Sequence, residues 1–219
     1  MNALAGIGMT SERTRARMVE RVREQGVRNE QVLNAMAVVP RHIFVEEAMA
    51  HRAYEDTALP LILGQTISQP YIVARMIELL LAGRSKLGKT LEIGAGCGYQ
   101  AAVMAQLTRE VYAVERIAPL LARARENLRT LKLTSIRLKH ADGMGGLPEA
   151  APFDSIIVAA GGAGVPVALR AQLAPGGRLV IPVGGGDQQI LVTVDNTPDG
   201  FVENSYDMVR FVPLLPGVA

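Results

Sequence analysis

The sequence predicts a doubly wound α/β fold with a mainly parallel seven-stranded sheet, an antiparallel C-terminal strand and an N-terminal helical extension. Two observations carry this prediction. From Lys89 onward, short β-rich runs alternate with segments of helical periodicity, which is the order expected for crossover helices on a parallel sheet. The last two β-rich runs have no helix between them, so we expect an antiparallel pair to finish the sheet.

Capping residues and helix breakers define the extension. Residues 11–25 form an arginine-rich helical pattern, and Asn29 can cap a second helix that ends before Pro40. Pro70 stands where the first turn of a third helix should be, because apolar residues follow it at core spacing. Three helices are therefore expected before the first long strand.

The core elements then follow in close order. Strands are predicted at residues 90–93, 111–115, 136–139, 155–159, 179–183, 190–194 and 208–212. Helices are predicted at residues 99–107, 117–131 and 167–173. The turn-rich residues 195–200 would separate the last two strands. The chain thus divides into an extension, residues 1–88, and a core, residues 89–219, which we expect to form one structural unit.

The composition is that of an ordinary globular protein. Of the 219 residues, 49% are hydrophobic and 20% are charged, and the net charge is only +2. Such a balance gives no broad electrostatic field for nucleic acid or for an anionic membrane. We expect neither as a partner, and we expect a monomer.

The cysteine and histidine content argues against disulfides and metals. Cys97 is the single cysteine, which excludes an internal disulfide and a multi-cysteine metal site. The three histidines are scattered without ligand spacing, so no metal is expected. Residues 1–10 lack the pattern of a signal peptide, and the uncharged residues 57–74 contain too many polar residues and prolines for a membrane helix. A reducing, cytoplasmic location is expected.

A glycine loop joins the first core strand to its helix. Gly94, Gly96 and Gly98 alternate, and such a loop lets a ligand approach backbone amides at a helix N-terminus. A dinucleotide fingerprint is G-x-G-x-x-G/A, whereas this spacing is G-x-G-x-G with Tyr99 at the place of the small residue. Glu92, in the preceding strand, makes the loop less favourable to phosphate. A ligand that is cationic or carries an amino group is favoured.

Further acidic residues follow the next two strands. Glu115 ends the second strand, about 20 residues beyond the loop, where a carboxylate can accept hydrogen bonds from ribose hydroxyls. Asp142, followed by Gly143, can accept from an adenine amino group. The alternatives are a surface glutamate paired with Arg116 and a plain Asp-Gly turn. Together these acids favour an adenosine-bearing cofactor without phosphate.

The loop from Gly94 to Gly98, with Glu115, resembles that of the class I S-adenosylmethionine-dependent methyltransferases, which have a Rossmann-like fold. The wider sequence resembles the protein-L-isoaspartate O-methyltransferase family over roughly residues 32–214. The most discriminating segment is 64–70, Gly-Gln-Thr-Ile-Ser-Gln-Pro, because many methyltransferases share the glycine loop. The other matching segments are residues 39–45, 53–56, 91–100, 114–117, 142–143, 151–154 and 211–214.

The resemblance implies transfer of a methyl group from S-adenosylmethionine to the free carboxyl of L-isoaspartyl, and also D-aspartyl, residues in damaged proteins and peptides. No general base is needed, because a carboxylate with a pKa of about 4 is already ionised. Ser68 would orient the substrate carboxylate, and residues 159–166 and 211–214 would border the peptide groove.

The resemblance also implies which residues bind the cofactor. Residues 1–88 would provide a lid over substrate and cofactor, and residues 89–219 the S-adenosylmethionine-binding core. The glycine loop would line the methionine part, Glu115 would contact the ribose and Asp142 the adenine. The full set is Thr66, Ile67, Gln69, Glu92, Gly94, Ala95, Gly96, Gly98, Glu115, Asp142 and Gly143.

The chain departs from the family pattern near the substrate. Ala159 stands where a threonine is usual, Met144 and Leu147 replace positions that are often aromatic, and Ala141 replaces a frequent glycine. A relaxed or shifted substrate preference is therefore open. The alternatives are a methyltransferase for a small molecule or RNA, a catalytically inactive cofactor-binding recognition module, and, least favoured by the loop spacing, a nicotinamide-dependent oxidoreductase.

Overall fold

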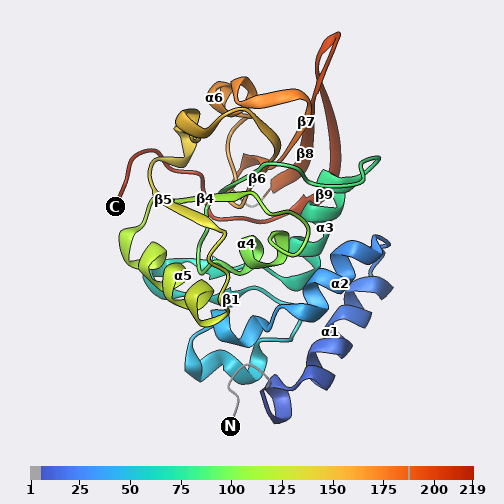
Figure 1. Ribbon diagram of the computed structural model, residues 1–219, viewed down its shortest axis with the longest axis vertical. Coiled ribbons are helices and arrows are strands. Elements are labelled where there is room, and N and C mark those ends of the chain that lie inside the picture. Colours follow the sequence, from blue (N-terminus) through green and yellow to red (C-terminus); the bar gives the residue numbers. More distant parts are fainter. Residues whose placement is uncertain (1–5, 187) are drawn as a thin grey trace.

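The computed structural model describes residues 6–186 and 188–219, which form a seven-stranded sheet covered by helices (Figure 1). Residues 1–5 lie outside the described residues. They are the start of the predicted extension and of residues 1–10, which lack a signal-peptide pattern. No helix in the described part of the chain is long and apolar enough to cross a membrane.

The sheet has the strand order β5-β4-β3-β6-β7-β8-β9. Its first five members in that order are parallel, and β8 and β9 continue the sheet as antiparallel neighbours. The chain winds outward from β3 to β5, returns to β6 on the other side of β3, and so creates a topological switch point between β3 and β6. The bounds are β3 Thr90–Ile93, β4 Val111–Glu115, β5 Arg137–His140, β6 Phe153–Val158, β7 Leu173–Gly185, β8 Gln188–Thr197 and β9 Gly200–Val209.

The predicted sheet is confirmed, but the last strand was misplaced. The prediction of residues 208–212 is wrong, because Thr197 pairs with Gly200 and the hairpin turn is only two residues long. Turn-like residues before it extend β8, since Asp195 forms an ion pair with Arg178 of β7, and Asn196 donates to two carbonyls of that strand. Cross-strand contacts thus outweigh local composition.

The helices begin at the expected capping residues. Ser11 accepts from Thr14 N at the start of α1, and Asn29 accepts from two amides at the start of α2. The α-helices are α1 Glu12–Glu24, α2 Glu30–Val38, α3 Pro70–Leu81, α4 Tyr99–Met104, α5 Ala118–Thr130 and α6 Val167–Ala171. Short 3-10 helices occupy Gly8–Thr10, Arg41–Phe44, Glu47–Arg52, Ile62–Gly64, Gly143–Gly145 and Pro148–Ala150. A small antiparallel pair, β1 Leu59–Pro60 and β2 Thr66–Ile67, precedes α3.

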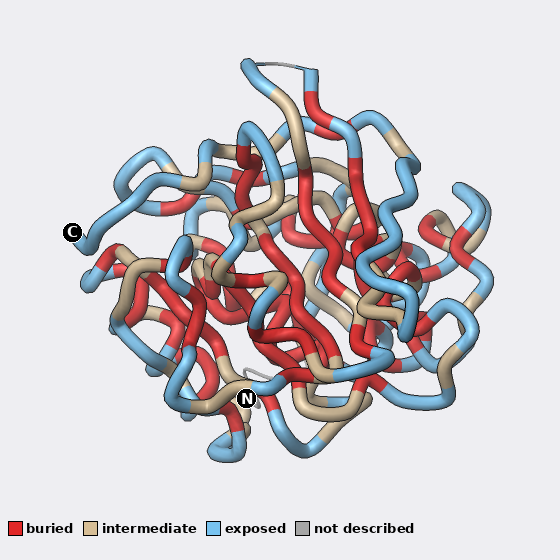
Figure 2. Tube along the Cα trace, turned by 90° about the horizontal axis from the view of Figure 1, so that it is seen from above, coloured by how far each residue is buried: buried red, intermediate tan, exposed pale blue. Residues whose placement is uncertain are grey.

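Two buried apolar clusters pack on opposite faces of the sheet, and Figure 2 shows the buried strands at the centre of the molecule. Leu91 and Ile93 of β3 belong to the cluster that α6 covers. Side chains alternate along a strand, so Glu92 points to the opposite face. Its register partners, Ala113 and Ile157, belong to the cluster formed with α1 to α5. The one charged residue of β3 thus lies beneath the N-terminal helices and α4.

Candidate active site

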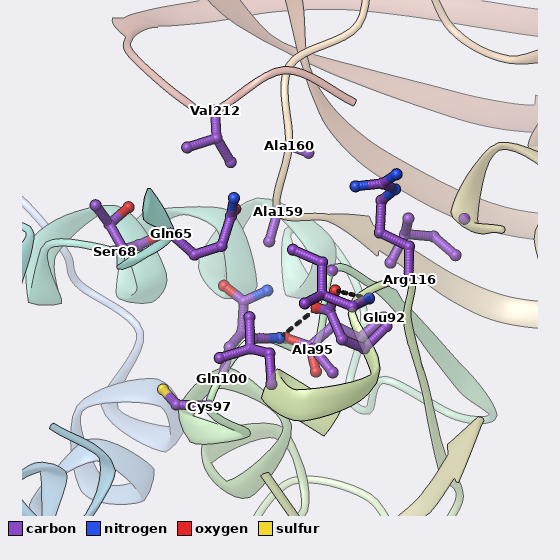
Figure 3. A pocket seen from close by; sticks show the side chains of 18 of the residues that line it. Gln65, Ser68, Glu92, Ala95, Cys97, Gln100, Arg116, Ala159, Ala160 and Val212 are labelled. Carbon is purple, nitrogen blue, oxygen red and sulfur yellow. Dashed lines mark hydrogen bonds between the residues drawn. The ribbon is translucent and has the colours of Figure 1, made fainter. Parts of the chain in front are cut away.

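A cavity of about 210 Å³ lies at the carboxyl ends of β3 and β4 and continues under the segment before α3 (Figure 3). In Figure 3, Gln65 and Ser68 stand on one side, Ala159, Ala160 and Val212 above, and Glu92, Ala95 and Gln100 below. Its walls are residues 64–68, 92–97, 114–117, 159–160 and 212–215, with Val73, Tyr99, Gln100, Leu120 and Gly143. This is the edge of an α/β sheet where ligands bind.

The glycine loop forms part of the cavity wall. Gly94, Gly96 and Gly98 have φ values of 85°, 56° and 89°, a region that other residues rarely adopt. A Cβ added to Gly96 would meet only the carbonyl oxygen of Gly94, at an ordinary contact distance of 4.0 Å, whereas one on Gly98 would approach Leu128 to 3.3 Å. Gly94 and Gly96 therefore line the cavity, and Gly98 instead allows α4 to pack closely against α5.

Glu115 holds the loop in place from the end of β4. Its Oε2 accepts from the amide of Gly96 at 2.9 Å, and its Oε1 accepts from the amide of Ile117 at 2.9 Å. The residue is only 5% exposed and lines the cavity. Each carboxylate oxygen can accept a second hydrogen bond, so both remain able to bind hydroxyl groups.

Glu92 is a fully buried acid at the base of the cavity. Neither oxygen has a hydrogen-bond partner among the described residues, and the same holds for Nε2 of Gln100. Burial raises the pKa of Glu92 well above its ordinary value of 4.5, and the charge of Glu115 adds to the rise. The side-chain amide of Gln100 lies near enough to favour the charged form and partly offsets the rise, although it makes no hydrogen bond of normal geometry to the carboxylate. An unpartnered buried carboxylate is costly. A ligand with an amino group would supply the missing partner, so the residues present fit S-adenosylmethionine.

The segment before α3 separates the cavity from a second, outer groove. The groove is lined by Thr57, Ala58, Thr66, Ser68, Gln69, Ile72, Ala159 and residues 208–212. Four residues line both spaces: Thr66, Ser68, Ala159 and Val212. The hydroxyl-bearing Ser68 thus stands at the junction between an inner cavity and an open groove.

Three predicted cofactor residues do not line the cavity. Gly98 packs against α5, and Gln69 lines the outer groove instead. Asp142 accepts from the amide of Met144 at 2.8 Å and from that of Gly217 at 2.7 Å, which holds the C-terminal segment against the end of β5. Its neighbour Gly143 does line the cavity. The remaining predicted residues, Thr66, Ile67, Ser68, Glu92, Gly94, Ala95, Gly96 and Glu115, all do so as well.

Other cavity residues were not predicted. Gln100 follows the glycine loop by two residues, and its position at the start of α4 was a usable signal. The C-terminal residues 212–214, which were expected to border the peptide groove, line the cavity, and so does the next residue, Leu215, which was not predicted. Cys97 also lines the cavity, and burial raises the pKa of its thiol to about 11. It is therefore not a thiolate nucleophile.

The described residues contain no group of three or more His, Cys, Asp or Glu side chains that could hold a metal ion. The polar residues that line the cavity are instead the hydroxyl-bearing Thr66, Ser68 and Tyr99, the acids Glu92 and Glu115, the amides Gln65 and Gln100, and Arg116, together with the backbone amides of the loop. Such a set can bind and orient ligands without a metal.

Sequence comparisons identify the family of the chain. The family model described as protein-L-isoaspartate(D-aspartate) O-methyltransferase matches residues 13–219. A protein-L-isoaspartate O-methyltransferase of Dechloromonas aromatica (strain RCB) is 72% identical over 214 residues, covering 98% of this chain and 99% of its own length. One from Azoarcus sp. (strain BH72) is 65% identical over 205 residues, covering 94% of each.

Solved structures agree with the sequence relatives. A structure described as a protein-L-isoaspartate O-methyltransferase from Plasmodium falciparum, in complex with S-adenosyl-L-homocysteine, matches with a TM-score of 0.81 at 25% identity, over 92% of this chain and 98% of that one. Another protein-L-isoaspartate O-methyltransferase matches with a TM-score of 0.81 at 29% identity, over 91% of this chain and 65% of that longer one. The chain belongs to the protein-L-isoaspartate(D-aspartate) O-methyltransferase family.

Proposed function

We propose that the chain transfers the methyl group of S-adenosylmethionine to the free carboxylate of L-isoaspartyl residues in damaged proteins, and that Ser68 orients this carboxylate. The observation that carries the proposal is the position of Ser68 on both the inner cavity and the outer groove. A cofactor in the cavity and a peptide in the groove would meet at its hydroxyl.

The cavity residues divide the cofactor among them. When bound, S-adenosylmethionine supplies a methyl group that is activated by a positively charged sulfur. Glu92 would accept from the amino group of its methionine part, and Glu115 from the ribose hydroxyls. Apolar walls at Ile117 and Leu120 would flank the adenosine, with Gly143 beside the adenine. Asp142 does not line the cavity, and its carboxylate would act there by holding the turn at Gly143 and the C-terminal segment in place.

The protein's contribution to the reaction would be to place the substrate carboxylate and the cofactor in line with each other. Transfer of the methyl group would need only the ionised substrate carboxylate held in line with it, with the neutral thioether of S-adenosylhomocysteine as the leaving group and a methyl ester as the product. No proton moves in this step, so no general base is required. Ser68 would donate a hydrogen bond to one carboxylate oxygen and leave the other facing the cavity. The lid and the C-terminal segment would exclude water from the reacting pair.

The extension would give this site its substrate class. We propose that residues 1–88 act as the lid over a general cofactor core, because they contribute Thr66, Ser68 and most of one groove wall. Ala159, at the junction of cavity and groove, provides a methyl group where the family usually has a hydroxyl. The groove is thereby more apolar beside the reacting carboxylate.

A pair of matched peptides tests the function. Purified protein with radiolabelled S-adenosylmethionine should methylate an isoaspartyl peptide and ignore the same peptide with normal aspartate. Equal inactivity on both, with S-adenosylhomocysteine still bound, would support a recognition module instead. Steeply salt-dependent binding to RNA would favour the RNA alternative.

A further inference from the structure

Asp56 lies outside the cavity, and its carboxylate contacts residues that flank the segment carrying Ser68. It lies in the turn that precedes β1, and it receives hydrogen bonds from three separate segments. Its Oδ2 accepts from Gln69 Nε2 at 2.7 Å and from Gln25 Nε2 at 2.6 Å, and its Oδ1 accepts from the amide of Tyr71 at 3.0 Å. The segments are the stretch directly before α3 that carries Ser68, the end of α1 and the first turn of α3.

Two of these contacts lie on either side of Pro70, directly after Ser68. Helix α3 has no side-chain cap of its own, and Pro70 at its first position has no amide hydrogen to donate. The amide of Tyr71 is therefore the first free donor of the helix, and Asp56 caps it from a distant part of the chain. The same carboxylate fixes the side chain of Gln69, the residue next to Ser68.

The turn that carries Asp56 is itself anchored from below. Arg41 is fully buried, and it donates to the carbonyl of Ala53 from Nε at 2.8 Å and to that of Thr57 from Nη2 at 3.5 Å. These two carbonyls lie on either side of Asp56 in the chain. The guanidinium carbon lies 4.9 Å from the ring centroid of Tyr99, a cavity residue. Through Arg41, the turn that carries Asp56 is thereby held against α4, the helix that follows the glycine loop.

We propose that Asp56 is a positioning residue that sets the place of the Ser68 hydroxyl through Gln69 and the first turn of α3. The inference rests on the proposed role of Ser68 in the methyl transfer. Loss of the carboxylate frees both the side chain of Gln69 and the start of α3, so the hydroxyl would no longer be held over the junction of cavity and groove. A displacement of about 1 Å can lower the rate of an oriented reaction by about a hundredfold.

A double-mutant cycle on kcat for an isoaspartyl peptide tests this. In the wild-type background, Asp56→Ala should lower kcat by about ten- to a hundredfold. In the Ser68→Ala background, the same change should lower kcat by less than about twofold, because the hydroxyl it positions is already gone. Equal fold losses in both backgrounds, or no loss in either, would overturn the inference.

Matched variants separate positioning from general stability. Gln25→Ala removes a hydrogen bond to the same carboxylate from α1 and should leave kcat within about twofold of the wild type. If thermal unfolding shows that Asp56→Ala does not fold, Gln69→Leu replaces it in the cycle, because that change removes the donor next to Ser68 and leaves the amide of Tyr71 capped by Asp56. If the wild type is active and Asp56→Ala lowers kcat equally in both backgrounds, only the positioning role of Asp56 is rejected. If the wild type does not methylate the isoaspartyl peptide at all, the proposed function is rejected as well.

Discussion

In the cofactor-free protein, Glu92 is a buried carboxylate without a hydrogen-bond partner, which is unfavourable in free energy. The amino group of S-adenosylmethionine would supply that partner on binding. Glu92→Gln removes the charge while keeping the shape of the side chain. We expect its dissociation constant for S-adenosylhomocysteine, measured by calorimetry, to rise about tenfold, as for the loss of one charge-assisted hydrogen bond. An unchanged constant would contradict the assignment of Glu92 to the amino group.

The same substitution has a pH signature in the cofactor-free protein. Because burial raises the pKa of Glu92 above its ordinary value of 4.5, the unfolded chain loses this proton at a lower pH than the folded protein does. Wild-type stability should therefore decrease as pH rises from about 4.5 through the raised pKa. Glu92→Gln lacks this proton, so its Tm advantage over the wild type should widen across that range. A Tm difference that is constant with pH would refute this.

A substitution of Glu115 tests its proposed contact with the ribose. Glu115→Ala leaves the amides of Gly96 and Ile117 without their acceptor, at about 1–3 kcal/mol for each buried group, and it also removes the proposed ribose ligand. Affinity for S-adenosylhomocysteine should fall by at least about tenfold in calorimetry. Glu110→Ala, at an exposed glutamate just before the same strand, is the matched control and should bind normally. Normal binding by Glu115→Ala would show the ribose assignment to be wrong.

Cavity residues could be predicted from the sequence where a local motif lies at the carboxyl end of a predicted strand. The glycine loop, Glu92 and Glu115 all line the cavity because the ends of β3 and β4 must meet at the switch point. Asp56 and Leu215 were not predicted as parts of the site, because their roles depend on contacts between segments far apart in the sequence. Such contacts leave no local pattern in a single sequence.

At the scale of elements, the short 3-10 helix Gly143–Gly145 offers a sharp packing test. A Cβ on Gly143 would lie 2.4 Å from Cγ2 of Ile93 in β3, whereas one on Gly145 would meet nothing within 4 Å. Gly143→Ala should therefore lower the free energy of unfolding by about 1–3 kcal/mol in denaturant titration. Gly145→Ala should leave it nearly unchanged, and equal stability of the two variants would refute this packing argument.

Element boundaries were predictable where caps or buried apolar runs mark them. Ser11, Asn29 and Pro70 mark helix starts, and β3 and β4 have the predicted bounds. The last strand was misplaced because its residues are mostly exposed and because residues 195–197, which resemble a turn, pair with residues 200–202 of β9, while Asp195 also pairs with Arg178 of β7. At a sheet edge, partners rather than composition decide where a strand begins.

At the scale of the whole molecule, the extension and the sheet are joined through one polar network. Glu78 of α3 accepts from the amides of Arg28 and Asn29, between α1 and α2, at 2.7 and 2.9 Å. It also pairs with Arg75, which in turn pairs with Asp207 of β9. Figure 1 shows these helices beside the sheet, with the C-terminal hairpin projecting beyond them. The segment that carries Ser68 is thus held on both sides.

In the proposed function, Ser68 at the junction of cavity and groove orients a substrate carboxylate toward a separately bound cofactor. The most direct measurement is kcat for an isoaspartyl peptide in Ser68→Ala, taken together with the dissociation constant for S-adenosylhomocysteine. We expect kcat to fall by about a hundredfold, while the dissociation constant changes by less than about threefold, a shift below about 0.7 kcal/mol. An unchanged kcat, or a loss of cofactor binding as large as the loss of kcat, would contradict it.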